Sequence, residues 1–150
     1  MNNKAAVPNT YLEPLGELVG TWNTVGSHPL MPDTELHGSV TFEWIDNGAF
    51  LRMSSMVDHP QIPDGITLFG SDNDAKHIIM LYFDERDISR KYDVSFEHNV
   101  LKWRRDNPKF SQRFTITIED DGNTMNGKGE MRRDGKTWEG DLELVYSRIK

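Results

Sequence analysis

Apolar and polar residues alternate along most of this chain, which is the pattern of β-strands that bury one face. In residues 39–44, and again in residues 110–118, the apolar side chains fall mainly at even positions. Short polar turns separate such runs, and the Asp-Asn-Gly of residues 46–48 and the Asp-Gly of residues 134–135 are typical of tight hairpins. The pattern predicts about ten sequential strands joined by hairpins.

One stretch ahead of the strands has helical spacing instead. Between residues 9 and 19, leucines recur every three residues. Thr10 and Glu13 have the spacing of a capping box, and Gly20 follows as a stop signal. Pro14 keeps the helix short because it lacks an amide hydrogen. We expect a short helix over about residues 9–19 that docks on the strands.

The expected architecture is one all-β domain over residues 1–150. The strand–helix–strand rhythm of a parallel sheet is missing. Sequential hairpins with one apolar face close most easily into an antiparallel up-and-down barrel, which removes exposed edges. We predict about ten strands over about residues 20–148. A barrel of ten strands is wider than the eight that side chains fill easily, so its interior should contain a cavity.

Charge and composition exclude several classes of partner and site. The chain has 17 Lys and Arg against 24 Asp and Glu, a net charge of −7. An acidic surface repels phosphate backbones and anionic lipid headgroups, so we expect neither nucleic acid nor membrane as a partner. There are no cysteines, which excludes disulfides and thiolate metal sites. Residues 1–8 contain no apolar signal-peptide segment, so we expect a cytoplasmic protein.

The first strand opens on Gly20-Thr21-Trp22. It resembles the Gly-x-Trp start of the calycin barrels, which include the lipocalins and the fatty-acid-binding proteins. In that superfamily a basic residue on the last strand packs over the tryptophan, and Arg148 stands at the matching place. The resemblance therefore implies that Trp22 and Arg148 close one end of the barrel, where a cation over an indole face contributes about 0.5–2 kcal/mol.

More closely, the chain from residue 15 onward resembles an uncharacterised bacterial family of calycin-like domains. The resembling stretches are residues 18–22, 42–45, 81–84 and 141–144. Such families are distantly similar to the nitrobindins, ten-stranded barrels that bind haem, and to the fatty-acid-binding proteins. The resemblance implies a fold more than a function.

Two departures argue against haem. The nitrobindin first strand is richer in glycine than residues 20–26, and the nitrobindin axial histidine lies near the final strands, whereas the last histidine here is His98. Haem iron needs an axial ligand such as imidazole, which His77 could supply. The five histidines are scattered without metal-ligand spacing. We expect no cofactor and no metal.

Polar residues share strand faces with apolar ones on three sequential strands. Arg90 alternates in step with Tyr92, Arg105 with Trp103, and Gln112 with its aromatic neighbours. A buried arginine must be paired or must meet an anionic ligand. The alternative is that both arginines extend to water from strand ends. We predict that Arg90 faces the cavity and anchors an anionic or strongly polar end of a ligand.

Aromatic residues with inward parity complete the predicted wall. The predicted cavity-lining residues are Phe42, Trp44, Arg90, Tyr92, Trp103, Arg105, Gln112, Phe114, Trp138 and Tyr146. Residues of this kind are also typical of a plain core, and in a wide barrel the two interpretations are compatible.

These observations favour a binding protein that holds a small hydrophobic or amphipathic molecule and performs no chemistry. The alternative is a small-metabolite enzyme, an isomerase or hydrolase, that uses Tyr92, His77 or an inward carboxylate as acid or base. A third alternative is an interaction module that forms a homodimer through exposed apolar residues such as Ile45, Leu51 or Ile79.

Overall fold

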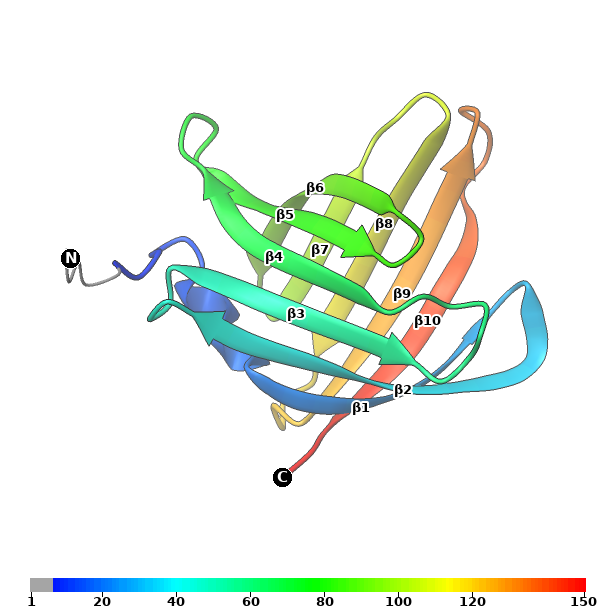
Figure 1. Ribbon diagram of the computed structural model, residues 1–150, viewed down its shortest axis with the longest axis horizontal. Helices are drawn as coiled ribbons and strands as arrows, with labels where there is room; N and C mark the ends of the chain where they lie inside the picture. The colour runs from blue at the N-terminus through cyan, green and yellow to red at the C-terminus, as the bar shows by residue number, and fades with distance from the viewer. Residues whose placement is uncertain (1–6) are drawn as a thin grey trace.

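A computed structural model describes residues 7–150 and shows a closed barrel of ten antiparallel strands (Figure 1). Residues 1–6, on which the expectation about a signal peptide mainly rests, lie outside the described residues. The strands are β1 (Gly20–His28), β2 (Met31–Ile45), β3 (Phe50–Val57), β4 (Gly65–Asp72), β5 (His77–Asp84), β6 (Ile88–Glu97), β7 (Val100–Arg105), β8 (Phe110–Ile118), β9 (Thr124–Arg133) and β10 (Glu139–Arg148).

Each strand pairs with its neighbours in sequence, and β1 pairs with β10 to close the barrel. The predicted all-β up-and-down barrel is therefore confirmed. The predicted hairpins have the expected backbone: Asp46 and Asn47 adopt φ values of 51° and 57°, as in the turns that match the twist of paired strands. The alternation of inward and outward side chains follows directly from this regular pairing.

The N-terminal helix is shorter and tighter than the sequence predicts. It is a 3₁₀-helix, η1 (Glu13–Leu18), and Thr10 makes no capping bond to it. Asn9 acts earlier instead, because its side chain accepts a hydrogen bond of 3.0 Å from the Tyr11 amide. Pro14 lies in the first turn and cannot donate, which favours a short element with i to i+3 bonding. In the part of the chain that is described, no helix has the length and apolar character to cross a membrane.

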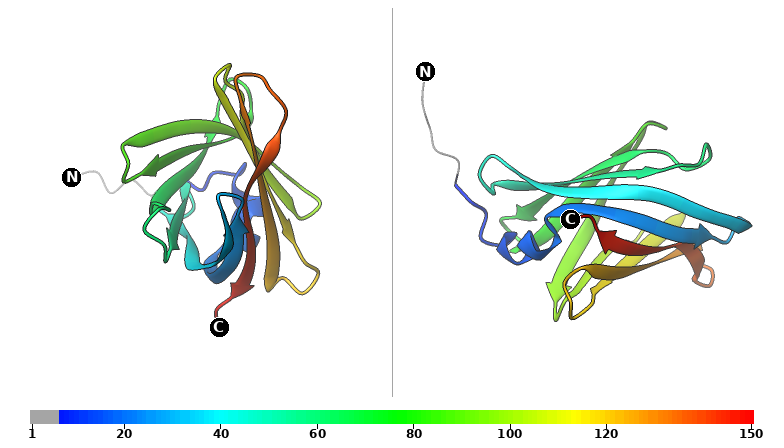
Figure 2. Two further views of the ribbon diagram at one scale, coloured as in Figure 1. Left: turned by 90° about the vertical axis from the view of Figure 1, so that its right-hand side faces the viewer. Right: turned by 90° about the horizontal axis from the view of Figure 1, so that it is seen from below.

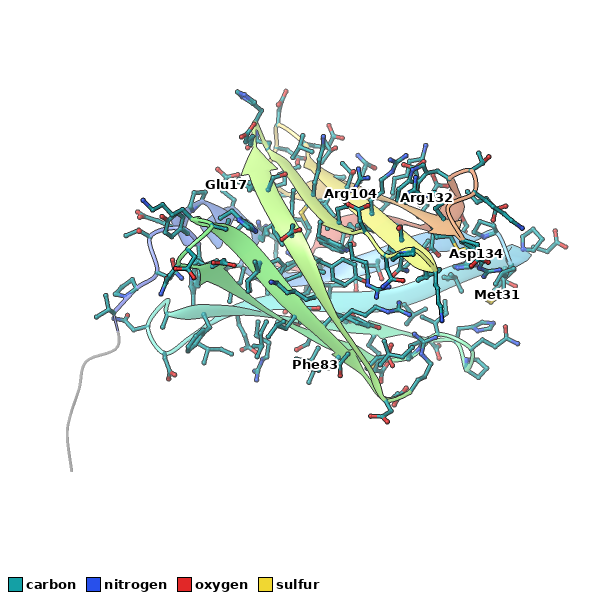
Figure 3. The ribbon with its side chains drawn as sticks, turned by 90° about the horizontal axis from the view of Figure 1, so that it is seen from above. Glu17, Met31, Phe83, Arg104, Arg132 and Asp134 are labelled. Atoms are coloured by element: carbon teal, nitrogen blue, oxygen red, sulfur yellow. The ribbon has the colours of Figure 1, made fainter. Side chains whose placement is uncertain are left out.

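The 3₁₀-helix η1 closes one end of the barrel (Figure 2). Its Leu15 and Leu18 are fully buried in one core cluster with Trp22 and Phe42. The Trp22 indole Nε1 donates to the Leu18 carbonyl at 2.9 Å. The turns after β1, β3, β5, β7 and β9 lie at the opposite end, which we call the mouth. Figure 3 shows Glu17 of η1 and Met31 at these two ends.

Candidate ligand-binding cavity

The barrel contains a cavity of about 450 Å³ between the buried core and the mouth. This volume lies within the range of small-molecule sites. Much of the lining is apolar, and Met53 and Met80 contribute flexible thioethers to it. Trp103 and Phe114 form part of the wall, with their rings stacked at 4.9 Å between centroids. Such a surface suits an apolar ligand segment.

A network of hydrogen bonds crosses one side of this cavity. The Arg90 Nη1 donates to the Gln112 Oε1 at 2.9 Å, and the Tyr92 hydroxyl donates to the same oxygen at 2.7 Å. The Gln112 Nε2 donates in turn to the Asp141 Oδ2 at 3.3 Å. Because its oxygen accepts twice and its nitrogen faces a carboxylate, the Gln112 amide has only one orientation that satisfies all its partners.

The network continues to the mouth through a histidine. The His28 Nε2 lies 2.9 Å from the Asp141 Oδ1, and both side chains are more than four-fifths buried. The Leu30 amide donates to the His28 Nδ1 at 3.1 Å. Because Nδ1 accepts this bond, the proton of the ring is on Nε2 and is donated to Asp141. Both ring nitrogens of His28 therefore have a partner in this arrangement.

Arg90 is a cation whose protein partners are neutral. Its guanidinium contacts Gln112 and lies 5.0 Å from the centroid of the Phe110 ring. Within residues 7–150, no carboxylate oxygen lies within 4.0 Å of its nitrogens. Four of its five N–H donors make no protein hydrogen bond among these residues.

A second arginine at the mouth shows the contrast. Arg86 also borders the cavity, but its Nη2 donates to the Asp84 carboxylate at 2.8 Å. Burial acts to raise the pKa of Asp84, yet the hydrogen bonds from Arg86 and Tyr82 outweigh it and lower that pKa to about 2. Arg86 thus has a carboxylate in direct contact, while Arg90 has none among the described residues.

The tyrosines of the cavity are neutral hydroxyl groups. Burial raises the pKa of Tyr92 above its ordinary value, although the neighbouring Arg90 acts in the opposite direction. Burial also raises the pKa of Tyr146 and of Tyr82. At physiological pH these phenols can donate hydrogen bonds, and they are poor candidates for a general base.

The structure brings most of the predicted wall together. Six of the predicted residues line the cavity: Arg90, Tyr92, Trp103, Gln112, Phe114 and Tyr146. Phe42 lies deeper, in the core cluster under η1. Arg105 is not among the lining residues, and its Nη1 donates to the Phe110 carbonyl at 2.8 Å. Arg105 is thus held by the backbone at the end of β7.

Trp44 does not line the cavity, contrary to the prediction. It has the same parity as Phe42, but it comes near the end of β2 and is 36% exposed. It lies beside η1, where a Cβ added to Gly16 would be 3.6 Å from the Trp44 Cζ2. The end of β2 extends past the cavity. An inward-facing side chain there therefore packs against η1 and not against the cavity.

Trp138 lies outside the barrel, which also corrects the prediction. It precedes β10, so the parity of that strand does not apply to it. Its ring is surrounded by the guanidiniums of Arg113, Arg132 and Arg104, at 3.9, 4.8 and 5.6 Å from the ring centroid. Arg104 and Arg132 are on the same outer face in Figure 3.

We expect Trp138→Leu to lower the free energy of unfolding by about 1–2 kcal/mol, because it removes cation–π contacts that are each worth about 0.5–1 kcal/mol at exposed sites. Urea denaturation followed by circular dichroism measures the change. Lys136→Ala, in the same connection, is the matched control and should leave stability within about 0.5 kcal/mol of the wild type. Equal stability of Trp138→Leu and the wild type would contradict this role.

His28 and Asp141 are among the polar cavity residues that sequence reasoning missed. His28 has the parity of Trp22 and Thr24, so alternation alone could have identified it at the end of β1. Asp141 could not be identified in this way. Leu144 and Tyr146 face inward at even positions, and a register shift between Gly140 and Glu143 brings the odd-numbered Asp141 to the same side.

The histidines do not fit an axial haem ligand. His77 lies on the outer face of β5, where its Nε2 is 3.0 Å from the Asp93 carboxylate, so it cannot act inside the cavity. His28 lines the cavity, but both of its ring nitrogens already have partners. Among the residues described, no group of three or more His, Asp and Glu side chains could hold a metal ion.

We therefore expect no stoichiometric Soret band when the protein is supplied with haem and then desalted. Binding through an imidazole would require His28 to give up one of its two partners. Absorbance spectroscopy of the desalted protein provides the measurement. A full Soret band that is lost in His28→Ala but retained in His77→Ala would overturn this expectation.

The apolar outer face differs in part from the one proposed for a homodimer, in which Ile45 and Ile79 are partly buried. Leu51 is fully buried, because it faces inward on β3. Four exposed apolar residues form cross-strand pairs on β4 and β5, Ile66 with Phe83 and Leu68 with Leu81. Figure 3 shows Phe83 pointing away from the barrel. A homodimer stays a prediction, and its best surface is this β4–β5 face.

A second hollow, of about 650 Å³, lies on the outside of β1, β8, β9 and β10. Its lining includes Val25, Thr117, Lys128 and Glu143, which are exposed side chains of mixed polarity. The inner cavity is smaller, but it combines burial with an organised polar network. The inner cavity is therefore the better candidate site.

Comparisons with known proteins support the fold. No protein-family model matches the chain, and no curated protein matches its sequence. The crystal structure of Rv2717c from M. tuberculosis is similar with a TM-score of 0.65 at 15% identity, over 96% of this chain and 100% of that one. At this identity the similarity establishes the fold alone. The resemblance to calycin-like barrels is thus confirmed at the level of architecture.

Two further structures are more distant. The zebrafish ileal bile acid-binding protein complexed with cholic acid has a TM-score of 0.46 at 13% identity, over 89% of this chain and 100% of that one. A protein of unknown function from the DUF3598 family of Nostoc punctiforme has a TM-score of 0.31 at 6% identity, over 94% and 100%. These similarities are too low to establish anything about this chain.

Proposed function

We propose that this protein binds a small amphipathic molecule inside the barrel, with an anionic group of the ligand against Arg90. The observation that carries this proposal is a cation in the cavity whose protein partners are neutral. Arg90 is partly buried, and moving a charge even partly out of water is costly unless an opposite charge or several hydrogen bonds compensate. An anionic ligand supplies both.

The chemistry of the guanidinium suits such a ligand. It presents a planar set of donors that matches a carboxylate or phosphate in a bidentate manner. Gln112 and Tyr92 fix the position of Arg90, because the Gln112 Oε1 accepts hydrogen bonds from both Arg90 and Tyr92. Arg90 is therefore oriented before the ligand arrives, which lowers the entropic cost of binding.

The remainder of the cavity suits an apolar tail. The stacked Trp103 and Phe114 provide a flat wall, and Met53 and Met80 can adjust to the shape of the tail. Each buried methylene group contributes about 0.8 kcal/mol. A medium-chain acid thus has partners for both of its ends.

Binding without chemistry is the function we favour over an isomerase or hydrolase. The phenols of Tyr92 and Tyr146 are neutral, and the lone pair of the His28 Nδ1 is already used by the Leu30 amide, so Asp141 is the cavity group that an enzyme would have to use as its base. A general base needs a free lone pair within reach of the substrate. Dodecanoic acid extracted after prolonged incubation with the protein should have an unchanged mass and an unchanged proton NMR spectrum.

A thermal-shift screen of linear acids and of the matching alcohols tests the proposed function. A ligand at 100 times its dissociation constant stabilises the fold by about 2.7 kcal/mol. For a chain of this size that corresponds to a rise in Tm of roughly 5–10 °C. We expect the acids to shift Tm and the alcohols to shift it much less. If no acid raises Tm, the proposed function is wrong.

A further inference from the structure

Asp141 is a second charge on the same side of the cavity. It accepts hydrogen bonds from the side chains of His28 and Gln112. No lysine or arginine nitrogen of residues 7–150 lies within 4.0 Å of its carboxylate. A carboxylate has about four acceptor positions, and only two are used here. Asp141 can therefore accept further hydrogen bonds from a molecule in the cavity.

The Gln112 side chain lies between Arg90 and Asp141 and contacts both of them. Its oxygen faces Arg90 and its nitrogen faces Asp141, so a single amide group stands between the cation and the anion. His28 holds Asp141 from the other side, and the Leu30 amide donates to the other nitrogen of the His28 ring. The cavity thus presents a donor-rich cation and an acceptor-rich anion side by side.

A plain carboxylic acid complements only half of this pair. Its carboxylate would match Arg90, but it would lie near Asp141, where like charges repel and no donor reaches the free acceptor positions. An acid with an N–H or O–H group one or two carbons away would match both. An ammonium group would also balance the charge of Asp141.

Resting on the function proposed above, we infer that the ligand is an amphipathic acid that carries an ammonium or hydroxyl donor close to its acidic group. The acidic group contacts Arg90, the donor contacts Asp141, and the apolar tail lies between the methionines and the aromatic wall. Asp141 then determines specificity, because it distinguishes donor-bearing acids from plain ones.

Isothermal titration calorimetry with three acids of equal chain length tests this inference. The probes are dodecanoic acid, 2-aminododecanoic acid and 3-hydroxydodecanoic acid. We expect the wild type to bind at least one of the two donor-bearing acids about 10-fold or more tighter than dodecanoic acid, as a hydrogen bond to a charged group provides. Asp141→Asn should remove this preference and should bind dodecanoic acid at least as well as the wild type.

The control variant is Glu143→Gln, which neutralises an exposed carboxylate on the same strand and should keep the preference. Asp141→Ser provides a second test in case the asparagine disturbs Gln112, and retained binding of dodecanoic acid shows that the cavity is intact. If neither donor-bearing acid binds tighter than dodecanoic acid, or if Asp141→Asn keeps the preference, this inference is wrong while the proposed function stands. If none of the acids binds, the proposed function fails.

Discussion

Arg90→Met is expected to weaken the binding of dodecanoic acid by roughly 30- to 100-fold. Removing one member of a buried charge pair costs about 2–3 kcal/mol or more, because the charge of the ligand is left without its partner. Methionine keeps much of the side-chain volume, so the loss of charge is the main change. Isothermal titration calorimetry on the wild type and the variant measures the ratio of the two dissociation constants.

The matched control is Arg52→Met. Arg52 is on the outer face of β3, where it donates to Glu43, so its charge is as large but cannot reach the cavity. Dodecanoic acid should bind this variant as it binds the wild type.

The stability of unliganded Arg90→Met is informative as well. Because this cation makes no direct ion pair with a carboxylate among the described residues, its removal should leave the free energy of unfolding unchanged or raise it. Urea denaturation without ligand measures this. Equal affinity of Arg90→Met and the wild type for the acid would show that Arg90 is not the anchor.

The wall around Arg90 could be predicted because its strands are regular. Arg90 and Tyr92 on β6, Trp103 on β7 and Gln112 on β8 keep strict alternation, and hairpins place these strands side by side. Parity and order are then enough to place the side chains on one face. What alternation cannot show is which polar groups will bond to each other. The bonds of Arg90 and Tyr92 to a shared amide oxygen required the structure.

Predictions failed where the chain departs from this regularity. Asp141 faces inward only because of the register shift in β10, and a bulge leaves no clear sign in a single sequence. Trp138 was placed by the parity of β10, which begins after it. Trp44 has the right parity but lies beside η1 at the end of β2. The composition of a strand end does not reveal which part of the barrel it will face.

The closure of the barrel end explains the Gly-x-Trp start in physical terms. Gly20 has a φ of 134°, and a Cβ added there would lie 2.8 Å from the Arg148 Nη1. Glycine thus provides both the backbone conformation and the space for the guanidinium. Trp22 provides the aromatic face over which that guanidinium lies, at 4.2 Å from the ring centroid. The Gly-x-Trp motif therefore forms the binding surface for the Arg148 guanidinium.

Arg148→Met should therefore lower the free energy of unfolding by about 3 kcal/mol, which corresponds to a fall in Tm of roughly 6–12 °C. The guanidinium donates to the carbonyls of Glu17, Val19 and Gly122, and so joins η1 and the residue that follows it to the β8–β9 turn. Methionine can cover the indole but cannot donate, so these partly buried carbonyls lose their partners. Urea denaturation and thermal melting give the two values.

The free energy of unfolding of Arg148→Lys should lie between the values of Arg148→Met and the wild type. Lysine keeps the charge over Trp22, but it cannot reach all three carbonyls at once. Arg52→Met, which removes an exposed arginine, should cost less than about 1 kcal/mol. The dissociation constant for dodecanoic acid should stay within about twofold of the wild-type value in folded Arg148→Met, since Arg148 is not among the residues that line the cavity. A loss of stability no larger than that of Arg52→Met would show that η1 is held by its buried leucines alone.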